Sequence, residues 1–270
     1  MVFLILISIA LAGFGGRVLW QRRRVAHLLT TPLKEDARAI IHKNVPLTCR
    51  LPKALHARLE GLVNRFLDQV KIHGFEGLEV TEEMRLTIAA QACLLLVNKE
   101  NRWYDNLHTI YLYPGAFRAK TVTAEGQVEH ADHIRLGEAW LRGPVVLSWD
   151  HVTYGAFIPN DGQNVVLHEF AHQLDFQTGV SDGAPLLDED HNARQWGEEL
   201  VPLYEKLKGD TEAGRKSFID PYGATNHAEF FAVATEFFFE KPAELREEAP
   251  TLYKHLSQYY RLDPAAWGAN

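Results

Sequence analysis

The residues best suited to chemistry lie in one helical turn, His168-Glu169-Phe170-Ala171-His172. Residues four apart on an α-helix share a face, so both imidazoles can bind one metal ion. Zinc held by neutral imidazoles with one open position lowers the pKa of its water to about 7, and a neighbouring carboxylate can take up the proton. The pattern predicts a zinc-dependent hydrolase with His168 and His172 as ligands and Glu169 as general base.

Five residues alone are a weak signal, because a chain with 13 histidines produces this spacing by accident in roughly one case in twenty. The competing interpretation is a half-buried helix that happens to carry two histidines. The surrounding sequence favours the metal, since Asp161–Asn164 offers helix-capping residues and mostly apolar positions follow. Histidine and glutamate on such a helix need partners, and one divalent cation can satisfy them together.

A catalytic zinc ion usually has three protein ligands, so another helix must supply the third. Asp175 shares the histidine face, but its short side chain is nearly a turn from the metal. We therefore expect it to accept from a ligand imidazole N–H and fix the tautomer. The best source of the third ligand is the aromatic helix predicted at Asn226–Glu240, which has Glu229 and Glu236 on one face. Glu240 is expected to be solvated.

Motifs across most of the chain carry a family resemblance. HEFAHQLD is followed by PYGAT, AEFFAVATEFFFE and LYKHLSQYYRLDP, and NVPL, EVTEEMRLTIAAQACLLL, YPGAF, LGEAW and GPVVLSWDHV precede it. Together they resemble the Mlc titration factor A family of bacterial zinc-dependent peptidases, over roughly residues 30 to 265. That family is described as having aminopeptidase-like activity and similarity to the catalytic domain of anthrax lethal factor.

The resemblance implies specific roles at the site. It implies one zinc ion per chain, with His168, His172 and Glu229 as ligands and Glu169 as general base. It also implies that Tyr222 of PYGAT stands beside the metal, where a phenol O–H can donate to the oxyanion of the tetrahedral intermediate.

Other polar residues receive supporting or neutral roles. Glu236 is expected to support a ligand without binding the metal. His227 departs from the family pattern two residues before the third ligand, and because i and i+2 face apart on a helix, we expect it at the surface. His130 and His133 lie in a polar stretch and are expected to be a solvated loop or strand edge rather than a second zinc site.

The order of patterns predicts an α+β fold. Helical patterns give way to strand-like runs and then to helices from Asn164 to the end. With no linker or repeat, we expect one zincin-like metallopeptidase domain with a small mixed or antiparallel sheet and an active-site helix. The strand Val145–Trp149, just before that helix, is the candidate edge for an extended substrate. Cys49 and Cys93 are too few for a disulfide framework, and Cys93 is expected in the core.

The N-terminus carries a second signal. Residues 2–20 are nearly all apolar, close to the ~20 residues that span a bilayer, and Arg22-Arg23-Arg24 follow. By the positive-inside rule the segment predicts an anchor, residues 1–28, that holds a peptidase domain, residues 29–270, at the cytoplasmic side of the inner membrane. A soluble cytoplasmic chain, a terminal amphipathic or buried helix, and a removed signal peptide are the alternatives.

Charge excludes one class of partner. Leaving Arg17 and Arg22–Arg24 out of the 28 basic residues leaves 24 against 35 acidic ones, a net charge of −11. Without a basic stripe, direct nucleic-acid binding is not expected. Two functions remain: a zinc peptidase that hydrolyses a peptide or protein substrate, and a regulatory protein that sequesters a transcriptional repressor of the Mlc type. The sequence selects neither a substrate nor between exopeptidase and endopeptidase action.

Overall fold

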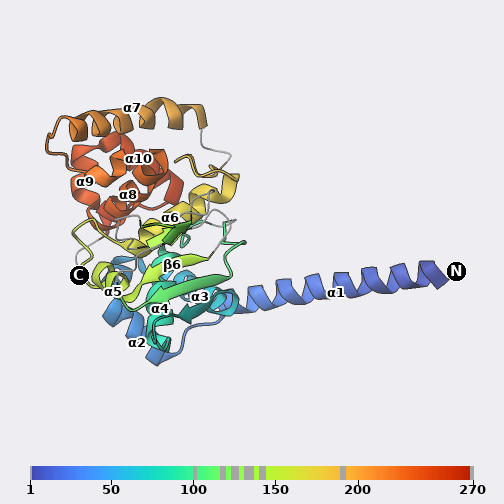
Figure 1. Cartoon of the computed structure of the whole chain (residues 1–270). Coiled ribbons are helices and arrows are strands. Elements are labelled where there is room, and N and C mark those ends of the chain that lie inside the picture. Colours follow the sequence, from blue (N-terminus) through green and yellow to red (C-terminus); the bar gives the residue numbers. More distant parts are fainter. Residues whose placement is uncertain are drawn as a thin grey trace.

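A computed structural model gives the fold, and Figure 1 shows it. For residues 2–12 and for the three strands between residues 120 and 139, only the backbone is described. The described residues are 2–99, 102–115, 120–122, 128–130, 137–139, 144–188 and 193–267.

The N-terminal half is mainly helical. Its elements are α1 (Val2–Thr30), α2 (Glu35–Asn44), the 3-10 helix η1 (Pro46–Arg50), α3 (Lys53–Gln69), β1 (Lys71–Gly74) and α4 (Glu82–Leu94). The end of α1 crosses α3 at backbone distance, because a Cβ on Gly61 would lie 2.2 Å from the Leu29 carbonyl oxygen. The fully buried α4 residues Ile88 to Leu94 place this helix in the centre of the core, and Cys93 is buried there as predicted.

A four-stranded sheet follows, in the order β1-β2-β6-β5. Strands β1, β2 (Thr109–Tyr113) and β6 (Val145–Ser148) run parallel, and β5 (Gly137–Ala139) pairs antiparallel with β6. The short strands β3 (Lys120–Val122) and β4 (Val128–His130) form a separate antiparallel pair. The predicted α+β class with a small mixed sheet is therefore confirmed.

The C-terminal half is again helical. Its elements are α5 (Trp149–Phe157), α6 (Val165–Asp175), η2 (Phe176–Thr178), α7 (Ala193–Glu212), η3 (Pro221–Ala224), α8 (His227–Glu240), α9 (Pro242–Glu248), α10 (Pro250–Tyr260) and η4 (Pro264–Ala266). In Figure 1, α7 to α10 form one layer and the sheet with α2 to α5 forms another. Helix α6 lies between the layers, in contact with α4, α8 and strands β5 and β6.

Three local predictions were wrong. The strand at Val145–Trp149 exists, but β6 is paired on both sides, so the edge nearest the active-site helix is β5. The sequence pattern predicts a helix over Pro52–Lys71, but α3 ends at Gln69 and Lys71 begins β1. Helices also resume earlier than predicted, with α5 at Trp149–Phe157, because Ser148 caps a helix directly after β6. Pairing with strands distant in sequence decided the first two cases, and the local cap at Ser148 decided the third.

The N-terminal helix extends away from the rest of the molecule (Figure 1). It continues unbroken through the predicted boundary at residue 28 and is tied to α3 by an ion pair between Arg24 and Asp68. Among the described residues, no helix is long and apolar enough to cross a bilayer. The side chains of residues 2–12, more than half of the apolar stretch 2–20, lie outside the described ones, so the anchor stays a prediction.

Candidate metal centre

Helix α6 presents both histidines of the motif on one face. Asn164 caps the helix, since its Oδ1 accepts from the backbone N–H of Leu167 at 3.0 Å, and this starts the helix one turn before His168. The apolar positions Val166, Leu167 and Phe170 are fully buried and fix the rotation of the helix. The remaining face carries the two imidazoles, whose side chains are 13% and 15% exposed.

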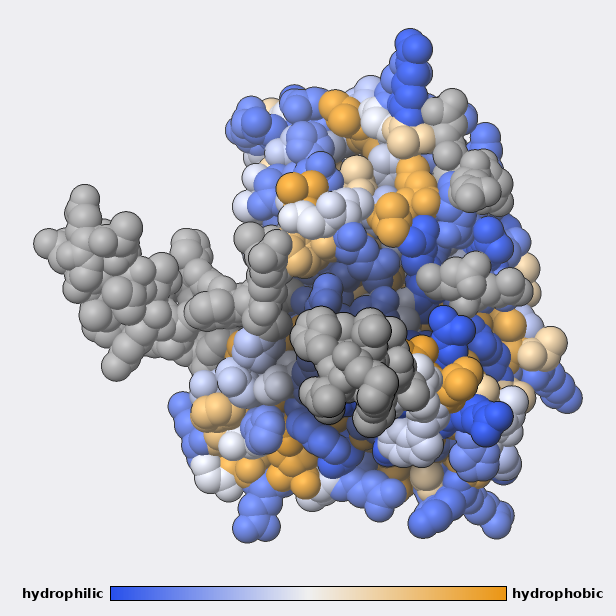
Figure 2. Space-filling model, turned by 90° about the vertical axis from the view of Figure 1, so that its right-hand side faces the viewer, coloured by the Kyte–Doolittle hydropathy of each residue, from blue (hydrophilic) through white to orange (hydrophobic). Residues whose placement is uncertain are grey.

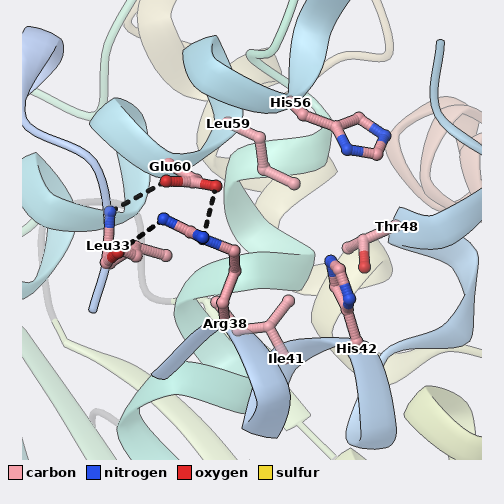
Figure 3. Close-up of a pocket in the computed structure, with 8 residues that line it drawn as sticks. All are labelled: Leu33, Arg38, Ile41, His42, Thr48, His56, Leu59 and Glu60. Carbon is pink, nitrogen blue, oxygen red and sulfur yellow. Dashed lines mark hydrogen bonds and ion pairs between the residues drawn. The ribbon is translucent and has the colours of Figure 1, made fainter. Parts of the chain in front are cut away.

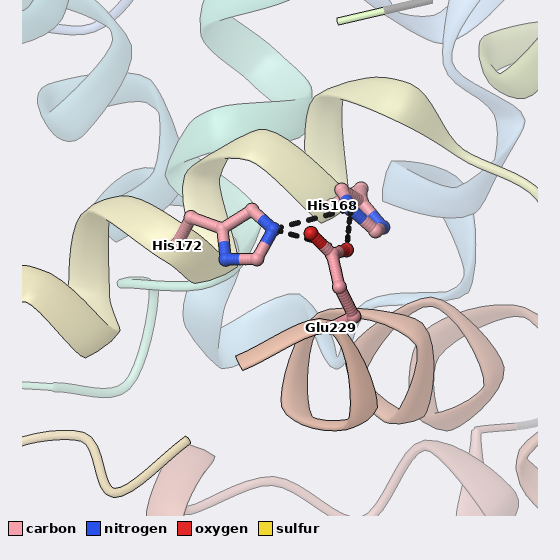
Figure 4. Close-up of side chains that lie close together, drawn as sticks. All are labelled: His168, His172 and Glu229. Carbon is pink, nitrogen blue, oxygen red and sulfur yellow. Dashed lines mark hydrogen bonds and ion pairs between the residues drawn. The ribbon is translucent and has the colours of Figure 1, made fainter. Parts of the chain in front are cut away.

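Glu229 approaches this pair from the first turn of α8, as Figure 4 shows. Its Oε2 lies 3.0 Å from His168 Nε2 and 3.4 Å from His172 Nε2, and the two Nε2 atoms are 3.2 Å apart. Asn226 caps α8 and accepts from the Glu229 backbone N–H, which fixes the start of the helix. Three side chains separated by up to 61 residues thus converge on one point, and they are the one metal-ligating group found among the described residues.

The dimensions of this triangle fit zinc. Ligand atoms held at about 2.0–2.1 Å on a tetrahedral ion are about 3.3 Å apart, and the three observed separations are 3.0, 3.2 and 3.4 Å. Two imidazole nitrogens and one carboxylate oxygen are also a donor set that catalytic zinc sites use. The residues present therefore fit a zinc ion with one position left for water or substrate.

Glu236 supports one ligand from behind, in the position predicted for it. His168 Nδ1 lies 2.8 Å from Glu236 Oε1, a hydrogen bond in which the ring N–H donates. The other oxygen of Glu236 accepts from the backbone N–H of Asn164. This arrangement leaves Nε2 of His168 free of a proton when a metal binds, because Nδ1 carries it.

Electrostatics show how strongly these groups are coupled. Burial disfavours the imidazolium of His168, but the carboxylates of Glu236 and Glu229 outweigh that effect and raise its pKa well above the ordinary value. Burial also opposes ionisation of Glu229, yet hydrogen bonds from His168 and His172 lower its pKa to about 2. Protons thus balance the carboxylates in the metal-free site, and a divalent cation would displace them.

Asp175 does not make the contact predicted for it. The side chain is fully buried, and its Oδ2 accepts from Ser181 Oγ at 2.9 Å and Gly183 N at 3.0 Å. Within the described part of the chain, no hydrogen bond joins Asp175 to His172. Burial raises the pKa of this carboxyl group. Asp175 therefore holds the loop after α6, because its short side chain ends beside that loop and not beside the imidazole.

The two residues predicted to act on substrate lie at the centre. Glu169 is 4% exposed and follows His168 directly on α6. Tyr222 on η3 is 55% exposed, and its ring centroid lies 5.9 Å from that of His168. Asp220 accepts from the Tyr222 backbone N–H at 2.8 Å and so shapes the turn. A rigid backbone with an exposed phenol places Tyr222 within reach of a bound molecule.

Glu240 corrects the sequence analysis. It was expected to be solvated, but it is 3% exposed and accepts from Gly162 N at 3.0 Å, Gln163 N at 3.1 Å and Asn164 Nδ2 at 3.1 Å. Burial raises its pKa to about 8. The sequence did contain a signal, since a position eleven residues after Glu229 returns to the same helix face.

Among the described histidines, only His168 and His172 belong to the metal-ligating group. His227 is exposed, as predicted, and its ring lies against that of Tyr204 at a centroid distance of 4.1 Å. The side chain of His130 and the whole of His133 lie outside the described residues.

The surroundings of the centre are open on one side. Figure 2 shows a hollow with mostly hydrophilic walls between the two layers, at the height that α6 occupies in Figure 1. A separate cavity of about 20 Å³ lies between α2, η1 and α3, room for roughly one water molecule. Figure 3 shows the ion pair of Arg38 and Glu60 at its wall. None of its eight lining residues belongs to the metal group, so this cavity is not the metal site.

The sequence is similar to known proteins over most of its length. Residues 18–261 match the family described as glucose-regulated metallo-peptidase M90. A Synechocystis protein described as uncharacterized protein slr2042 is 38% identical over 266 residues, 97% of this chain and 96% of the relative. Proteins named Mlc titration factor A from Yersinia pestis and Yersinia pseudotuberculosis are 29% identical over 232 residues, 83% of each chain. The predicted relationship is confirmed, and the chain belongs to the glucose-regulated metallo-peptidase M90 family.

Proposed function

We propose that this chain is a zinc-dependent peptidase of the zincin type. The observation that carries the proposal is the triangle of His168, His172 and Glu229, whose sides match those of a tetrahedral zinc site. The family description supports a metallopeptidase without naming the metal. When bound, zinc supplies a Lewis acid and lowers the pKa of water.

The side chains of the chain divide the remaining chemistry among them. Glu169 takes the proton of the attacking water and passes it to the leaving amine, because it directly follows a ligand histidine on α6 and its carboxylate acts on the charge of that imidazole. Tyr222 donates its phenol O–H to the developing oxyanion. Glu236 keeps His168 in the tautomer that binds metal.

The substrate backbone has an edge available beside these residues. Among the described strands, β5 lies at the end of the sheet, packs against α6 and pairs only with β6. An extended peptide added there would gain main-chain hydrogen bonds that align its scissile carbonyl. This edge replaces the β6 edge suggested by sequence order.

The experiment compares Glu169→Gln with the wild-type chain in zinc content and peptide cleavage on the same preparation. Loss of the general base is expected to lower kcat about 100- to 10,000-fold while zinc stays stoichiometric. Unchanged cleavage would refute Glu169 as base. Aminopeptidase action is tested with the same peptide carrying a free or an acetylated N-terminus, since only an aminopeptidase requires the free amine.

A regulatory function is the second candidate, because relatives at 29% identity bear the name Mlc titration factor A. In this alternative the chain sequesters a transcriptional repressor of the Mlc type, and hydrolysis is secondary. Binding of an Mlc-type repressor from the same organism, measured by calorimetry with wild type and Glu169→Gln, separates the two. Tight binding by both chains without detectable peptide cleavage would favour the regulatory function.

The cellular location is a further part of the proposal. Residues 2–20 would anchor the chain in the inner membrane, with the peptidase domain on the cytoplasmic side. Supporting this, Phe14 is 69% exposed and Leu19 and Trp20 are each 58% exposed on α1. Fractionation of the full chain beside a variant that lacks residues 1–28 is the test. Recovery of the full chain entirely in the soluble fraction would refute the anchor.

A further inference from the structure

Three carboxylates of α8 form a ladder along α6. Glu229, Glu236 and Glu240 are spaced by seven and four residues, so they lie within about 40° of one another around the helix. Glu229 contacts His168 and His172, Glu236 contacts His168 and the Asn164 backbone, and Glu240 contacts the preceding loop. Each step forward on α8 thus meets an earlier part of α6, so the two helices run antiparallel.

Glu240, the last carboxylate of this ladder, binds the segment at the start of α6, the helix that carries the histidines. Glu240 Oε2 accepts from the backbone N–H groups of Gly162 and Gln163, and Oε1 accepts from Asn164 Nδ2. The first turn of α6 contains no acidic residue of its own. The side-chain oxygens that accept from the backbone N–H groups of Gly162, Gln163 and Asn164 therefore come from α8.

The segment that Glu240 binds, residues 162–164, is closely packed against its neighbours. Gly162 has a φ of +84°, and a Cβ there would lie 2.8 Å from the Phe237 ring. A Cβ on Gly155 would lie 2.8 Å from Asn164 Cα, while Asn164 Nδ2 donates to the Gly155 carbonyl at 3.0 Å and to Gln91 Oε1 at 2.9 Å. Asn164 is therefore held by α4, α5 and α8 together.

We propose that Glu240 is a positioning residue of the metal centre, which acts through Asn164 to set the register of α6 against α8. A shift of one helix along the other would separate Glu229 from the histidines, since those atoms are only 3.0 and 3.4 Å apart. Glu240 touches neither metal ligand nor substrate. The role rests on the proposed zinc site, but it concerns metal affinity and does not require that the chain cleave peptides.

The test compares Glu240→Ala, Glu240→Gln and Glu199→Ala in the full chain. Glutamine keeps one carbonyl oxygen for the two backbone N–H groups and loses only the acceptor toward Asn164, so it should rescue part of the effect. Glu199→Ala is the matched control. Glu199 lies on α7 and is not part of the ladder, and its carboxylate is 2.9 Å from the buried His255 of α10. Zinc dissociation constants are measured by chelator competition well below each variant's Tm. Amide hydrogen exchange of residues 162–168 is measured on the metal-free chains.

Loss of a supporting partner usually weakens metal affinity 10- to 100-fold. We expect about tenfold for Glu240→Ala, an intermediate value for Glu240→Gln, and no change for Glu199→Ala. Exchange of residues 162–168 should rise in Glu240→Ala only. A purely structural role would lower Tm and leave the zinc constant unchanged, which overturns the proposal while the zinc site stands. A wild-type chain that binds no zinc refutes the proposed function, and unchanged exchange in Glu240→Ala then refutes the register role as well.

Discussion

The interface of α6 with α8 and the outer part of α1 depart from the usual burial rule in opposite directions. The interface buries Glu236 and Glu240 to 7% exposure or less. Helix α1 instead leaves large apolar side chains such as Phe14 and Trp20 more than half exposed. Charged groups are seldom buried without partners, and apolar groups gain by leaving water. The buried carboxylates are balanced by hydrogen bonds within the chain, whereas the exposed apolar side chains of α1 motivate the membrane anchor proposed above.

The two regions also differ in how firmly the protein holds them. The carboxylates of the interface are fixed by hydrogen bonds from α6 and its preceding loop, so the site is organised before a metal arrives. Among the side chains described on α1, which begin at residue 13, the first ion pair with the rest of the molecule is that of Arg24 with Asp68. Pre-organisation lowers the cost of binding one specific ion, whereas a free apolar helix suits a partner with no fixed shape.

The largest expected effect is on zinc binding at the interface of α6 with α8. Glu229→Ala removes one of three ligands and is expected to abolish stoichiometric zinc binding, because two imidazoles alone form an incomplete site. Metal analysis of the purified variant checks this. Glu247→Ala on α9, an exposed glutamate, is the matched control and should keep its zinc. A Glu229→Ala chain with one zinc ion would remove Glu229 from the ligand set.

Zinc should also stabilise the folded chain. A ligand that binds only the native state adds about 4 kcal/mol when its free concentration is 1,000 times Kd. We therefore expect Tm to fall when a chelator removes zinc from the wild type. In Glu229→Ala the chelator should have no effect, and an equal fall in both chains would mean that the stabilising metal is bound elsewhere.

A third prediction uses the pH dependence of the metal-free chain. Burial raises the pKa of Glu240 from 4.5 to about 8, so its folded form prefers the proton. The contribution to stability is full below pH 4.5 and is lost as pH rises toward 8, because the native state binds more protons than the unfolded state. The free energy of unfolding should fall with pH across this window. The fall should be shallower in Glu240→Gln, and identical slopes would show that Glu240 does not titrate there.

The smallest effect on stability is expected in α1. Replacing Phe14 and Trp20 by serine removes exposed apolar groups and should change the free energy of unfolding by less than about 0.5 kcal/mol each. Membrane recovery of the full chain should nevertheless fall. Chemical denaturation and fractionation measure the two quantities, and a large loss of stability would show that these side chains pack against the domain.

Some of the site could be predicted because it depends on local periodicity. The motif on α6 and the shared face of Glu229 and Glu236 follow from the 3.6-residue repeat, and capping chemistry placed the start of α6 within Asp161–Asn164. The roles of Glu229 as third ligand and of Tyr222 at the site came from family resemblance, since nothing local to either residue distinguishes it. Tyr222 is 55% exposed in the structure, which is compatible with its proposed role.

Other features depend on contacts between distant segments. The sequence of β6 is that of a buried strand, but only its pairing with β2 and β5 shows that it is not an edge. Asp175 shares a face with the histidines, yet the loop at Ser181 and Gly183 claims its carboxylate. Glu240 looked like a surface residue at the end of its helix until the loop before α6 was placed over it.

The sequence by itself determined which helix faces carry chemistry, because side-chain direction on a helix repeats with a fixed local period. It also determined the family, through motifs spread over most of the chain. Only the tertiary structure decided the position of α8 along α6. That position determines which carboxylate contacts the histidines and which ones bind the start of α6. That register is set by hydrogen bonds between residues more than 60 positions apart, and no local pattern encodes such a pairing.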